Sequence, residues 1–317
     1  MSSMPAPSQT PRPLPVRLSP SRAKDFLQCP QLFYYKTILG LPTPSSVPMA
    51  KGTLAHTAFE RLFDHTKEER RDPATALAYV EPGWEVMVNP FAQRDDVAPD
   101  SPEARIRNKE HLWVGELDEE SWEFAQAHSR AEEYRALMAK GSPEEAKFLK
   151  DTAKIVENYF SIERPWNFDP EARELHLEAE SLGVTLHGFI DRLDRYTTST
   201  GEERWVISDY KTGKVHQPRF ADDAFFQLKV YAVLLKLVEG VTAHKLRLLY
   251  VSAQQPDAVQ ELLVDDAILE STQRKMAQIW NEMQAAEAED MWEAKKGPLC
   301  NWCHFKPQCP AFTSSKR

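Results

Sequence analysis

The spacing of apolar positions along this 317-residue chain divides it into helical and strand-like stretches. Apolar residues recur at helical spacing in residues 52–63, 142–160, 222–238 and 265–296, which predicts helices. Apolar and polar residues instead alternate in residues 173–180, 184–194, 204–210 and 244–252, which predicts strands. The chain order is therefore helices, three strands, a helix, a strand and a final helix.

Short turns at Leu182-Gly183 and Thr200-Gly201 separate the first three strands and predict an antiparallel meander. We expect the meander and the fourth strand to form an α/β core, a mixed sheet flanked by helices. Ser142-Pro-Glu-Glu145 is a capping box that predicts the start of one helix. Ser21 is predicted to cap a short helix that runs through Cys29.

The remaining stretches are polar and predict a tail and an insertion. Residues 1–16, rich in Pro, Ser and Gln, predict a disordered tail ahead of one domain that spans residues 17–317. Residues 66–140 are charged and predict a mostly helical insertion with at least one long loop. The sequence has neither a run of about 18 apolar residues nor the apolar segment of a signal peptide, so we expect a cytoplasmic protein without a membrane partner.

The net charge of −9 is unexpected for a protein that binds nucleic acid, because such proteins usually present a basic surface. The acidity is concentrated in residues 61–150, where 13 Lys and Arg face 20 Asp and Glu, a net of −7. All other residues together carry only −2, and residues 1–60 carry +4 from 6 basic and 2 acidic side chains. Local basic surface elsewhere is therefore compatible with the composition, and carboxylates that bind metal account for some of the acidity.

Four cysteines occur, and three of them lie close together near the C-terminus. Cys300, Cys303 and Cys309 are spaced Cys-x₂-Cys-x₅-Cys, whereas Cys29 lies about 270 residues upstream. Reduced thiols in this arrangement favour binding of a metal or cluster over disulfides, because the expected compartment is reducing. The spacing alone favours zinc and an iron–sulfur cluster equally. We expect a structural site that joins residues 297–312 to Cys29 and holds the two chain ends together.

Asp191 and Asp209 are the central pair of candidate catalytic residues. Each is expected near the end of one of two neighbouring antiparallel strands, which brings the carboxylates together. Close carboxylates repel each other unless a cation lies between them, and Mg²⁺ or Mn²⁺ binds one or two carboxylates together with substrate phosphate oxygens. Lys211, two residues after Asp209 on the same strand face, can orient the attacking water and stabilise charge on phosphorus.

Each of these patterns is weak by itself. An Asp-x-Lys pair is usually a solvated pair of charges, and His56 on its amphipathic helix is more often a packed or surface histidine. Gln227 and Tyr231, one helical turn apart, could be a partly buried polar pair. The ordered combination is much less expected by chance.

In this combination the chain resembles the RecB-like branch of the PD-(D/E)xK nuclease superfamily, the branch that carries an iron–sulfur cluster. The resemblance covers about residues 18–312, with the insertion as the main unmatched part. It rests on five motifs: Gly52-Thr-Leu-Ala-His56, Gly188-Phe-Ile-Asp191-Arg192, Asp209-Tyr-Lys211-Thr-Gly213, Gln227-Leu-Lys-Val-Tyr231, and Cys29 with Cys300, Cys303 and Cys309. Ile stands before Asp191 in place of Pro, which is common in this branch, and the acid of the (D/E)-x-K motif is Asp209.

The resemblance implies a restriction-endonuclease-like core and a metal site. His56, Asp191, Asp209 and the backbone carbonyl of Tyr210 would bind Mg²⁺ or Mn²⁺, and Lys211 would act on the attacking water.

The same resemblance implies roles for the remaining motifs. Gln227 and Tyr231 would contact the substrate or orient the catalytic groups, and the four cysteines would bind a [4Fe–4S] cluster. Glu178 is a weaker candidate outside this set. Arg192 is a candidate for contact with phosphate or with a carboxylate.

The implied function is a metal-dependent deoxyribonuclease, an exonuclease on single-stranded or end-containing DNA used in repair or recombination. Three alternatives stay open: a nuclease subunit that works beside a helicase, a CRISPR-associated adaptation nuclease, and a non-enzymatic DNA-binding module. The chain has no Gly-x₄-Gly-Lys-Ser/Thr loop, so a helicase or other repair protein would be a separate partner. CRISPR adaptation nucleases tend to be shorter, and retention of every catalytic residue type disfavours a non-enzymatic module.

Overall fold

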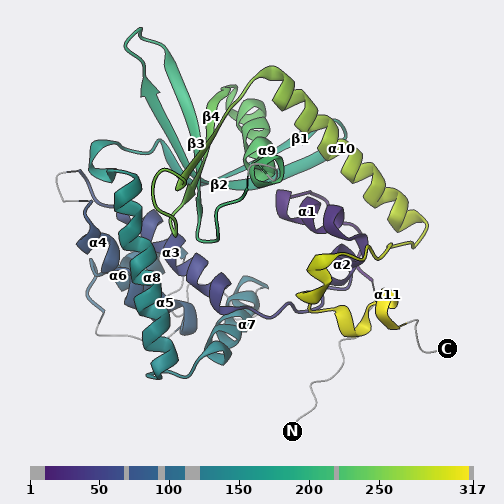
Figure 1. Cartoon of the computed structure of the whole chain (residues 1–317), viewed down its shortest axis with the longest axis horizontal. Coiled ribbons are helices and arrows are strands. Elements are labelled where there is room, and N and C mark those ends of the chain that lie inside the picture. The colour runs from purple at the N-terminus through teal and green to yellow at the C-terminus, as the bar shows by residue number, and fades with distance from the viewer. Residues whose placement is uncertain (1–10, 68–70, 92–96, 111–121, 218–220, 314–317) are drawn as a thin grey trace.

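A five-stranded mixed sheet lies at the centre of this computed structural model, which describes residues 11–67, 71–91, 97–110, 122–217 and 221–313 (Figure 1). The strands pair in chain order, and every pair is antiparallel except β3 with β4, which is parallel. The predicted α/β core with a mixed sheet is confirmed. The strand bounds are Ala172–Ser181 (β1), Val184–Thr197 (β2), Glu203–Lys211 (β3), Ala243–Tyr250 (β4) and Val259–Leu263 (β5).

The turn between β1 and β2 sets the register of the two strands that carry most of the candidate site. Leu182 and Gly183 both have positive φ, +50° and +79°, a conformation that matches the twist of the flanking strands. Ser181 therefore lies opposite Val184, and the pairing continues in the same register along the hairpin. A shift of one residue would turn every side chain to the other face, so this turn decides which β1 residues face the functional side of β2.

The strands differ from the sequence prediction in two places. Asp191 was expected near a strand end but lies within β2, which continues to Thr197. The fifth strand, β5, was not predicted because it is a short edge strand with partly exposed side chains. Its pairing with β4, rather than its own apolar pattern, defines it.

Helices α1, α9 and α10 cover one face of the sheet (Figure 1). Their bounds are Pro20–Gln28 (α1), Ala221–Glu239 (α9) and Asp266–Ala288 (α10). The apolar side chains of α9 are buried on nearly every side, because this helix lies between the sheet and α10. This layer contains the larger of two apolar clusters in the described residues.

Helices α3 and α8 pack against the second face of the sheet, and α5 packs on these two helices (Figure 1). Their bounds are Val47–Leu62 (α3), Val80–Val88 (α5) and Pro143–Ile162 (α8). Ser142 caps α8 as predicted, because its hydroxyl accepts a hydrogen bond from the backbone of Glu145. Tyr210 and Leu249 of the sheet belong to this second cluster, which therefore packs directly behind the candidate site.

Two helix ends differ from the prediction. Helix α1 is capped by Ser19 rather than Ser21, because Pro20 occupies the first helical position, where a missing N–H costs nothing. Helix α10 was expected to run to residue 296 but ends at Ala288. Asp290 adopts a left-handed conformation, and the N–H of Met291 bonds back to the carbonyl of Ala286, which closes the helix end.

The predicted insertion is helical in its described parts. It contains α4 (Pro73–Leu77), α5, α6 (Pro102–Glu110) and α7 (Trp122–Leu137), which pack with α3 and α8. The predicted long loop near residues 90–103 falls partly on residues 92–96, outside the described residues.

Most of the predicted disordered tail, residues 1–10, also lies outside the described residues. From Arg12 onward the backbone makes definite contacts, since the N–H groups of Arg12 and Leu14 bond to Ile38 and Glu287. Among the described residues, no helix is both long and apolar enough to span a membrane.

Candidate active site

The candidate site forms where β2, β3 and α3 meet. The β2–β3 ladder pairs Arg192 with Ser208, and one step further along the same register brings Asp191 opposite Asp209. Like charges directly opposite on neighbouring strands destabilise a sheet unless a cation or a proton intervenes. The predicted proximity of these two carboxylates therefore follows from the register.

Helix α3 brings His56 to this carboxylate pair. His56 Nδ1 lies 3.4 Å from Asp191 Oδ2, and Nε2 lies 2.8 Å from the backbone oxygen of Tyr210. The backbone N–H of Tyr210 in turn donates to Asp191 Oδ2 over 3.1 Å. Three of the four groups that the sequence predicts as metal ligands therefore contact one another, whereas Asp209 is placed near them by the strand register.

Glycine at position 52 permits this close approach of α3 to the sheet. A Cβ at Gly52 would lie 3.1 Å from the side-chain oxygen of Thr212, which follows β3. A larger residue would require Thr212 or the helix, which carries His56 one turn later, to adjust its position.

The buried position of Asp191 makes its carboxyl group hard to ionise. Burial and the nearby charge of Asp209 raise the pKa of Asp191 to about 6. Asp209 is 2% exposed, and its buried Oδ2 atom accepts no hydrogen bond from the described residues, although Lys211 Nζ lies 2.7 Å away in charge contact. Carboxylate oxygens are natural ligands for a divalent cation.

A further acid that the sequence prediction missed belongs to this group. Ligand atoms of His56, Glu174 and Asp191 lie within 4.8 Å of one another. Glu174 adopts φ of +46° within β1, an unusual conformation for a residue with a side chain, and such strain tends to occur at functional sites. By contrast Glu178, the weaker candidate, pairs with Arg17 on the surface over 2.6 Å and is not part of the group.

The hairpin register contained the signal for Glu174. A two-residue turn at residues 182–183 places position 174 opposite Asp191, and position 178 opposite His187. Glu60, one helical turn after His56, lies at the same pocket and was also missed.

Gln227 and Tyr231 lie on α9 against β2. Gln227 Nε2 donates to the hydroxyl of Tyr231 over 2.6 Å. The Tyr231 ring lies so close to β2 that a Cβ at Gly188 would be 2.4 Å from its Cε1 atom. Glycine is therefore needed at position 188, and the predicted pair supports the strand that carries Asp191. Burial raises the pKa of the Tyr231 hydroxyl well above its usual value, so this group stays protonated.

Arg192 points away from the carboxylate pair, because successive strand residues face opposite sides. Its side chain is 1% exposed and forms a bidentate ion pair with Glu163 at the end of α8. Nη1 and Nη2 lie 2.7 Å and 2.9 Å from the two carboxylate oxygens. Arg192 was predicted to contact either phosphate or a carboxylate, and in this structure it contacts a carboxylate. Arg192 therefore links β2 to the end of α8 and does not face the carboxylate pair.

The space around the metal-ligand group is an open pocket of about 610 Å³. Phe189 lies at its edge, half exposed, and stacks on His176 with ring centroids 4.6 Å apart. An exposed aromatic ring beside metal ligands offers a surface on which an unpaired base can stack.

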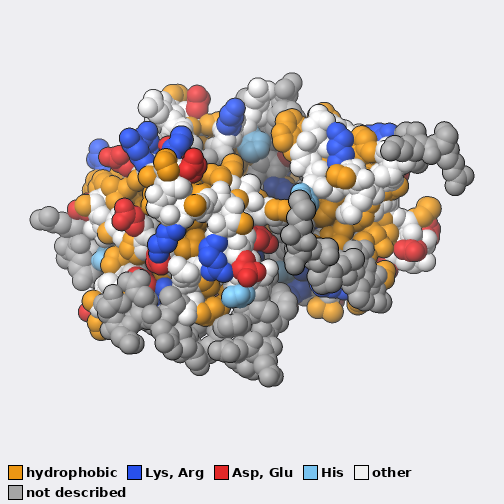
Figure 2. Space-filling view, turned by 90° about the horizontal axis from the view of Figure 1, so that it is seen from below, with side chains coloured by type: hydrophobic (Ala, Val, Ile, Leu, Met, Phe, Trp, Pro, Cys, Tyr) orange, Lys and Arg blue, Asp and Glu red, His pale blue; other side chains and the backbone are white. Residues whose placement is uncertain are grey.

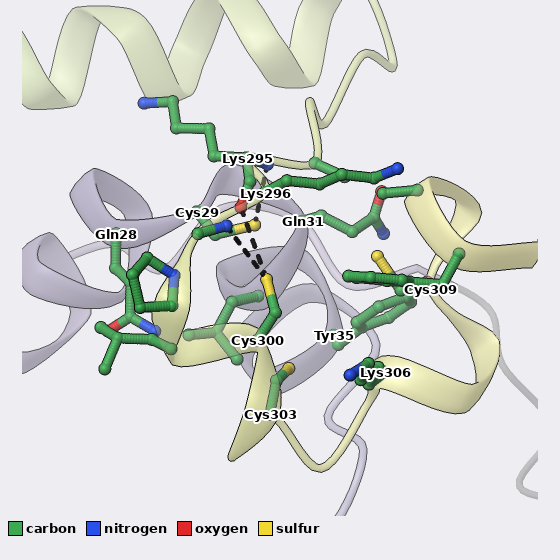
Figure 3. A pocket seen from close by; sticks show the side chains of 17 residues that line it. Gln28, Cys29, Gln31, Tyr35, Lys295, Lys296, Cys300, Cys303, Lys306 and Cys309 are labelled. Carbon is green, nitrogen blue, oxygen red and sulfur yellow. Dashed lines mark hydrogen bonds between the residues drawn. The ribbon is translucent and has the colours of Figure 1, made fainter.

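The four cysteines form a second centre, remote in sequence from the first but built from both chain ends (Figure 3). Cys29 follows α1, and the other three lie in short helical turns near Pro298–Asn301, Lys306–Gln308 and α11 (Pro310–Thr313). All four line one pocket of about 150 Å³. The predicted joining of residue 29 to the C-terminal segment is thus present in the geometry.

The surroundings of the sulfur atoms suit thiolates. Backbone N–H groups of Lys295 and Gly297 lie 3.4 Å from the sulfurs of Cys29 and Cys300. Lys295, Lys296 and Lys306 line the same pocket and supply positive charge. Burial and the neighbouring cysteines act in the opposite direction and raise the pKa of the Cys309 thiol.

The comparison with known families agrees with this geometry. The family described as the PD-(D/E)XK nuclease superfamily matches residues 17–123 and 95–310. The chain therefore belongs to the PD-(D/E)XK nuclease superfamily, whose members are nucleases that use divalent metal ions.

Among solved structures, the chain is similar to the crystal structure of "Putative exonuclease" from Eubacterium rectale, with 11% identity and a TM-score of 0.45. The similarity covers 91% of this chain and 87% of that one. No curated protein sequence matches the chain.

Proposed function

We propose that this chain is a metal-dependent deoxyribonuclease of the RecB-like branch, an exonuclease on single-stranded or end-containing DNA used in repair or recombination. The observation that carries the proposal is the meeting of His56, Asp191, Glu174 and the Tyr210 carbonyl, with Asp209 opposite Asp191 in the strand register. The five motifs that resemble this branch include all of these residues except Glu174.

The donor set fits Mg²⁺ or Mn²⁺, because carboxylate and carbonyl oxygens are the ligands these ions prefer and an imidazole suits Mn²⁺ as well. We propose Asp191, Asp209, His56 and the Tyr210 carbonyl as ligands, with Glu174 as an added candidate. A bound ion would polarise the scissile phosphate and acidify the attacking water.

The chain's own residues would then position the reaction. Lys211 Nζ, held 2.7 Å from Asp209, can bind the attacking water and stabilise charge on the phosphate oxygens. Gln227 and Tyr231 would keep β2 and Asp191 in place from the other side. Phe189 can stack with an unpaired base, which favours a single-stranded substrate.

The surface agrees with local rather than broad attraction of DNA. On the face shown in Figure 2, basic and acidic side chains are interspersed among apolar ones over the described part of the chain. Binding through unpaired bases near the site suits such a surface better than binding along a duplex backbone.

The experiment that tests the proposal is degradation of end-labelled DNA by anaerobically purified protein. Single- and double-stranded substrates would be compared with Mg²⁺, Mn²⁺ and EDTA, with Asp209→Asn as the inactive variant. We expect metal-dependent cleavage of single strands, lost by at least about a thousandfold in the variant. Absence of cleavage on every substrate, from protein with a full cysteine centre, would overturn the proposal of an autonomous nuclease, and a co-purifying ATPase would then indicate a helicase-partnered subunit.

We propose that the four cysteines bind a [4Fe–4S] cluster. Four thiolates around one zinc ion at about 2.3 Å would lie about 3.8 Å apart. Among the described cysteines, no three sulfur atoms gather within 4.8 Å of one another. A cluster is larger than a single ion and holds its thiolates further apart, and N–H donors to the sulfurs are typical of such sites.

The cysteine centre is expected to be structural, so Cys303→Ser should yield unstable or insoluble protein. The centre closes a loop of about 270 residues, and structural metal sites contribute about 10 kcal/mol or more to folding. Thermal unfolding, iron content and visible absorption of the purified variant would measure the loss. Asn301→Ser, between two ligands in the same segment, is the matched control and should behave like wild type. A Cys303→Ser protein of normal stability that had lost only activity would show that the role is not structural.

A further inference from the structure

A second cavity lies beside the metal-ligand pocket, within the helical insertion. It has a volume of about 300 Å³, at the lower end of the range for small-molecule pockets. Two residues of α3, Thr53 and Thr57, line both this cavity and the metal-ligand pocket. The two spaces are therefore neighbours across one edge of α3, and a single substrate strand can reach from one into the other.

The floor of the cavity is apolar and comes from the insertion. Gly83, Val86 and Met87 of α5 line it together with Pro90 and Ile106. Gly83 permits the packing of α5 on α3, since a Cβ there would lie 2.7 Å from Leu54 Cδ1. This floor suits the flat, uncharged face of a nucleobase.

The rim of the cavity is polar and includes Arg130, whose side chain is exposed. Gln126, Arg130 and Tyr134 of α7 line it. Arg61 also lines it, but this buried side chain is already paired with Glu60 and Asp64. Arg130 is exposed and makes no hydrogen bond or ion pair with any described residue. A guanidinium and an amide at the rim can hydrogen-bond the polar edge of a base or stack on it.

The charge of the insertion indicates which part of a nucleic acid enters. Residues 61–150 carry a net charge of −7, so this module repels phosphate and offers no broad attraction to the backbone. An apolar cavity with one free cation at its rim instead fits the uncharged base. A paired base cannot leave its stack without cost, so the occupant must come from an unpaired strand.

We propose that this cavity binds an unpaired nucleobase of the substrate strand, adjacent to the nucleotide whose phosphate lies at the metal-ligand pocket. The proposal rests on the nuclease function proposed above and gives the insertion a role in recognition of single strands.

The test measures binding without cleavage in the Asp209→Asn background. The probes are a fluorescein-labelled oligothymidylate, an abasic oligomer of the same length, and a blunt duplex. Ala127→Phe fills the cavity from α7, and Arg130→Ala removes the rim cation. Arg274→Ala, an exposed arginine on α10, is the matched control for Arg130→Ala.

Each cavity variant is expected to raise the Kd for oligothymidylate by about 5- to 100-fold while leaving the Kd for the abasic oligomer unchanged. Arg274→Ala should leave both constants unchanged. Equal affinity of wild type and both cavity variants for oligothymidylate, or an equal loss for the abasic oligomer, would overturn the proposal. Thermal unfolding of each variant separates occupancy of the cavity from misfolding, and Arg130→Ala on the surface preserves the test if Ala127→Phe fails to fold.

Cleavage assays on the same variants with Asp209 restored distinguish this proposal from the nuclease proposal. Intact cleavage with unchanged KM in the cavity variants would refute the base site and leave the nuclease function standing. Absence of cleavage in the wild type, with base-dependent binding that the variants lose, would refute the nuclease function and leave the base site standing.

Discussion

Replacing Asp191 with Asn is expected to abolish DNA cleavage and, in the metal-free protein, to raise the free energy of unfolding near neutral pH. Cleavage should fall by at least about a thousandfold, because the substitution removes a charged ligand of the proposed metal ion. The Asn side chain has the same shape and can still accept the hydrogen bond from Tyr210 N–H. The fold therefore loses little, while the repulsion between two buried carboxylates disappears.

The direction of the stability change follows from the pKa of Asp191. Burial and the charge of Asp209 raise this pKa from 3.8 to about 6, so the folded state holds the proton more tightly than the unfolded chain. Ionising the carboxyl costs stability progressively as the pH rises from about 4 to about 6, and the full cost persists above that range. The variant should gain about 1–3 kcal/mol at about pH 7.5 and little at about pH 4.

Urea unfolding at both pH values, either in EDTA or with Mg²⁺ in place of EDTA, would measure these effects. The wild type should gain stability when Mg²⁺ is added, and the variant should not. Asp257→Asn, an exposed acid in the loop before β5, is the matched control and should change neither stability nor cleavage. Retained cleavage would remove Asp191 from the proposed ligand set, and a loss of stability at pH 7.5 would show that the two carboxylates do not repel each other in the free protein.

Replacing Arg192 with Met is expected to lower the free energy of unfolding by about 3–5 kcal/mol. Glu163, the residue that follows α8, would lose its bidentate partner while still buried, although Arg247 lies 2.6 Å away and would compensate in part. Breaking one side of a buried pair is costly because the remaining charge has little solvent. Cleavage should fall as well, since Arg192 holds the strand segment that carries Asp191.

Urea unfolding monitored by circular dichroism would test this prediction. Arg195→Met is the matched control, because Arg195 is exposed and pairs with Glu171 and Glu203 on the surface. The control should lose much less stability than Arg192→Met, because exposed ion pairs are screened by solvent. The double variant Arg192→Met with Glu163→Gln should recover part of the loss, since it removes the stranded charge. A loss below about 1 kcal/mol in Arg192→Met would show that the pair does not hold β2 to α8.

The contribution of Glu163 to the free energy of unfolding depends on pH in the opposite direction from that of Asp191. Burial acts to raise the pKa of Glu163, but the charges of Arg192 and Arg247 outweigh it and hold that pKa at about 2. The stabilisation by this group is therefore fully present above about pH 4.5 and is lost as the pH falls toward 2. The metal site and this pair thus respond to acid in opposite directions.

The local patterns of the sequence determined the strands, the helices and the motif residues. Alternating apolar positions defined β1 to β4, and helical spacing defined α3, α8 and α9 with His56 on its helix. The two-residue turn at 182–183 could also be predicted from the sequence, and the register that follows from it places Glu174 opposite Asp191. Glu178, the weaker candidate on the same strand, instead pairs with Arg17 at the surface.

Only the tertiary structure decided which of these residues meet. The edge strand β5 exists through its pairing with β4, and α10 ends early because Asp290 takes a left-handed conformation that the helical spacing of the sequence did not predict. Arg192 faces Glu163 because α8 ends against that side of the sheet. The cavity between α3, α5 and α7 forms because helices that are distant in the sequence pack together. Helices and strands can be predicted from the sequence because the spacing of their apolar residues follows the backbone periodicity. Contacts between distant elements cannot, because they depend on how whole layers pack.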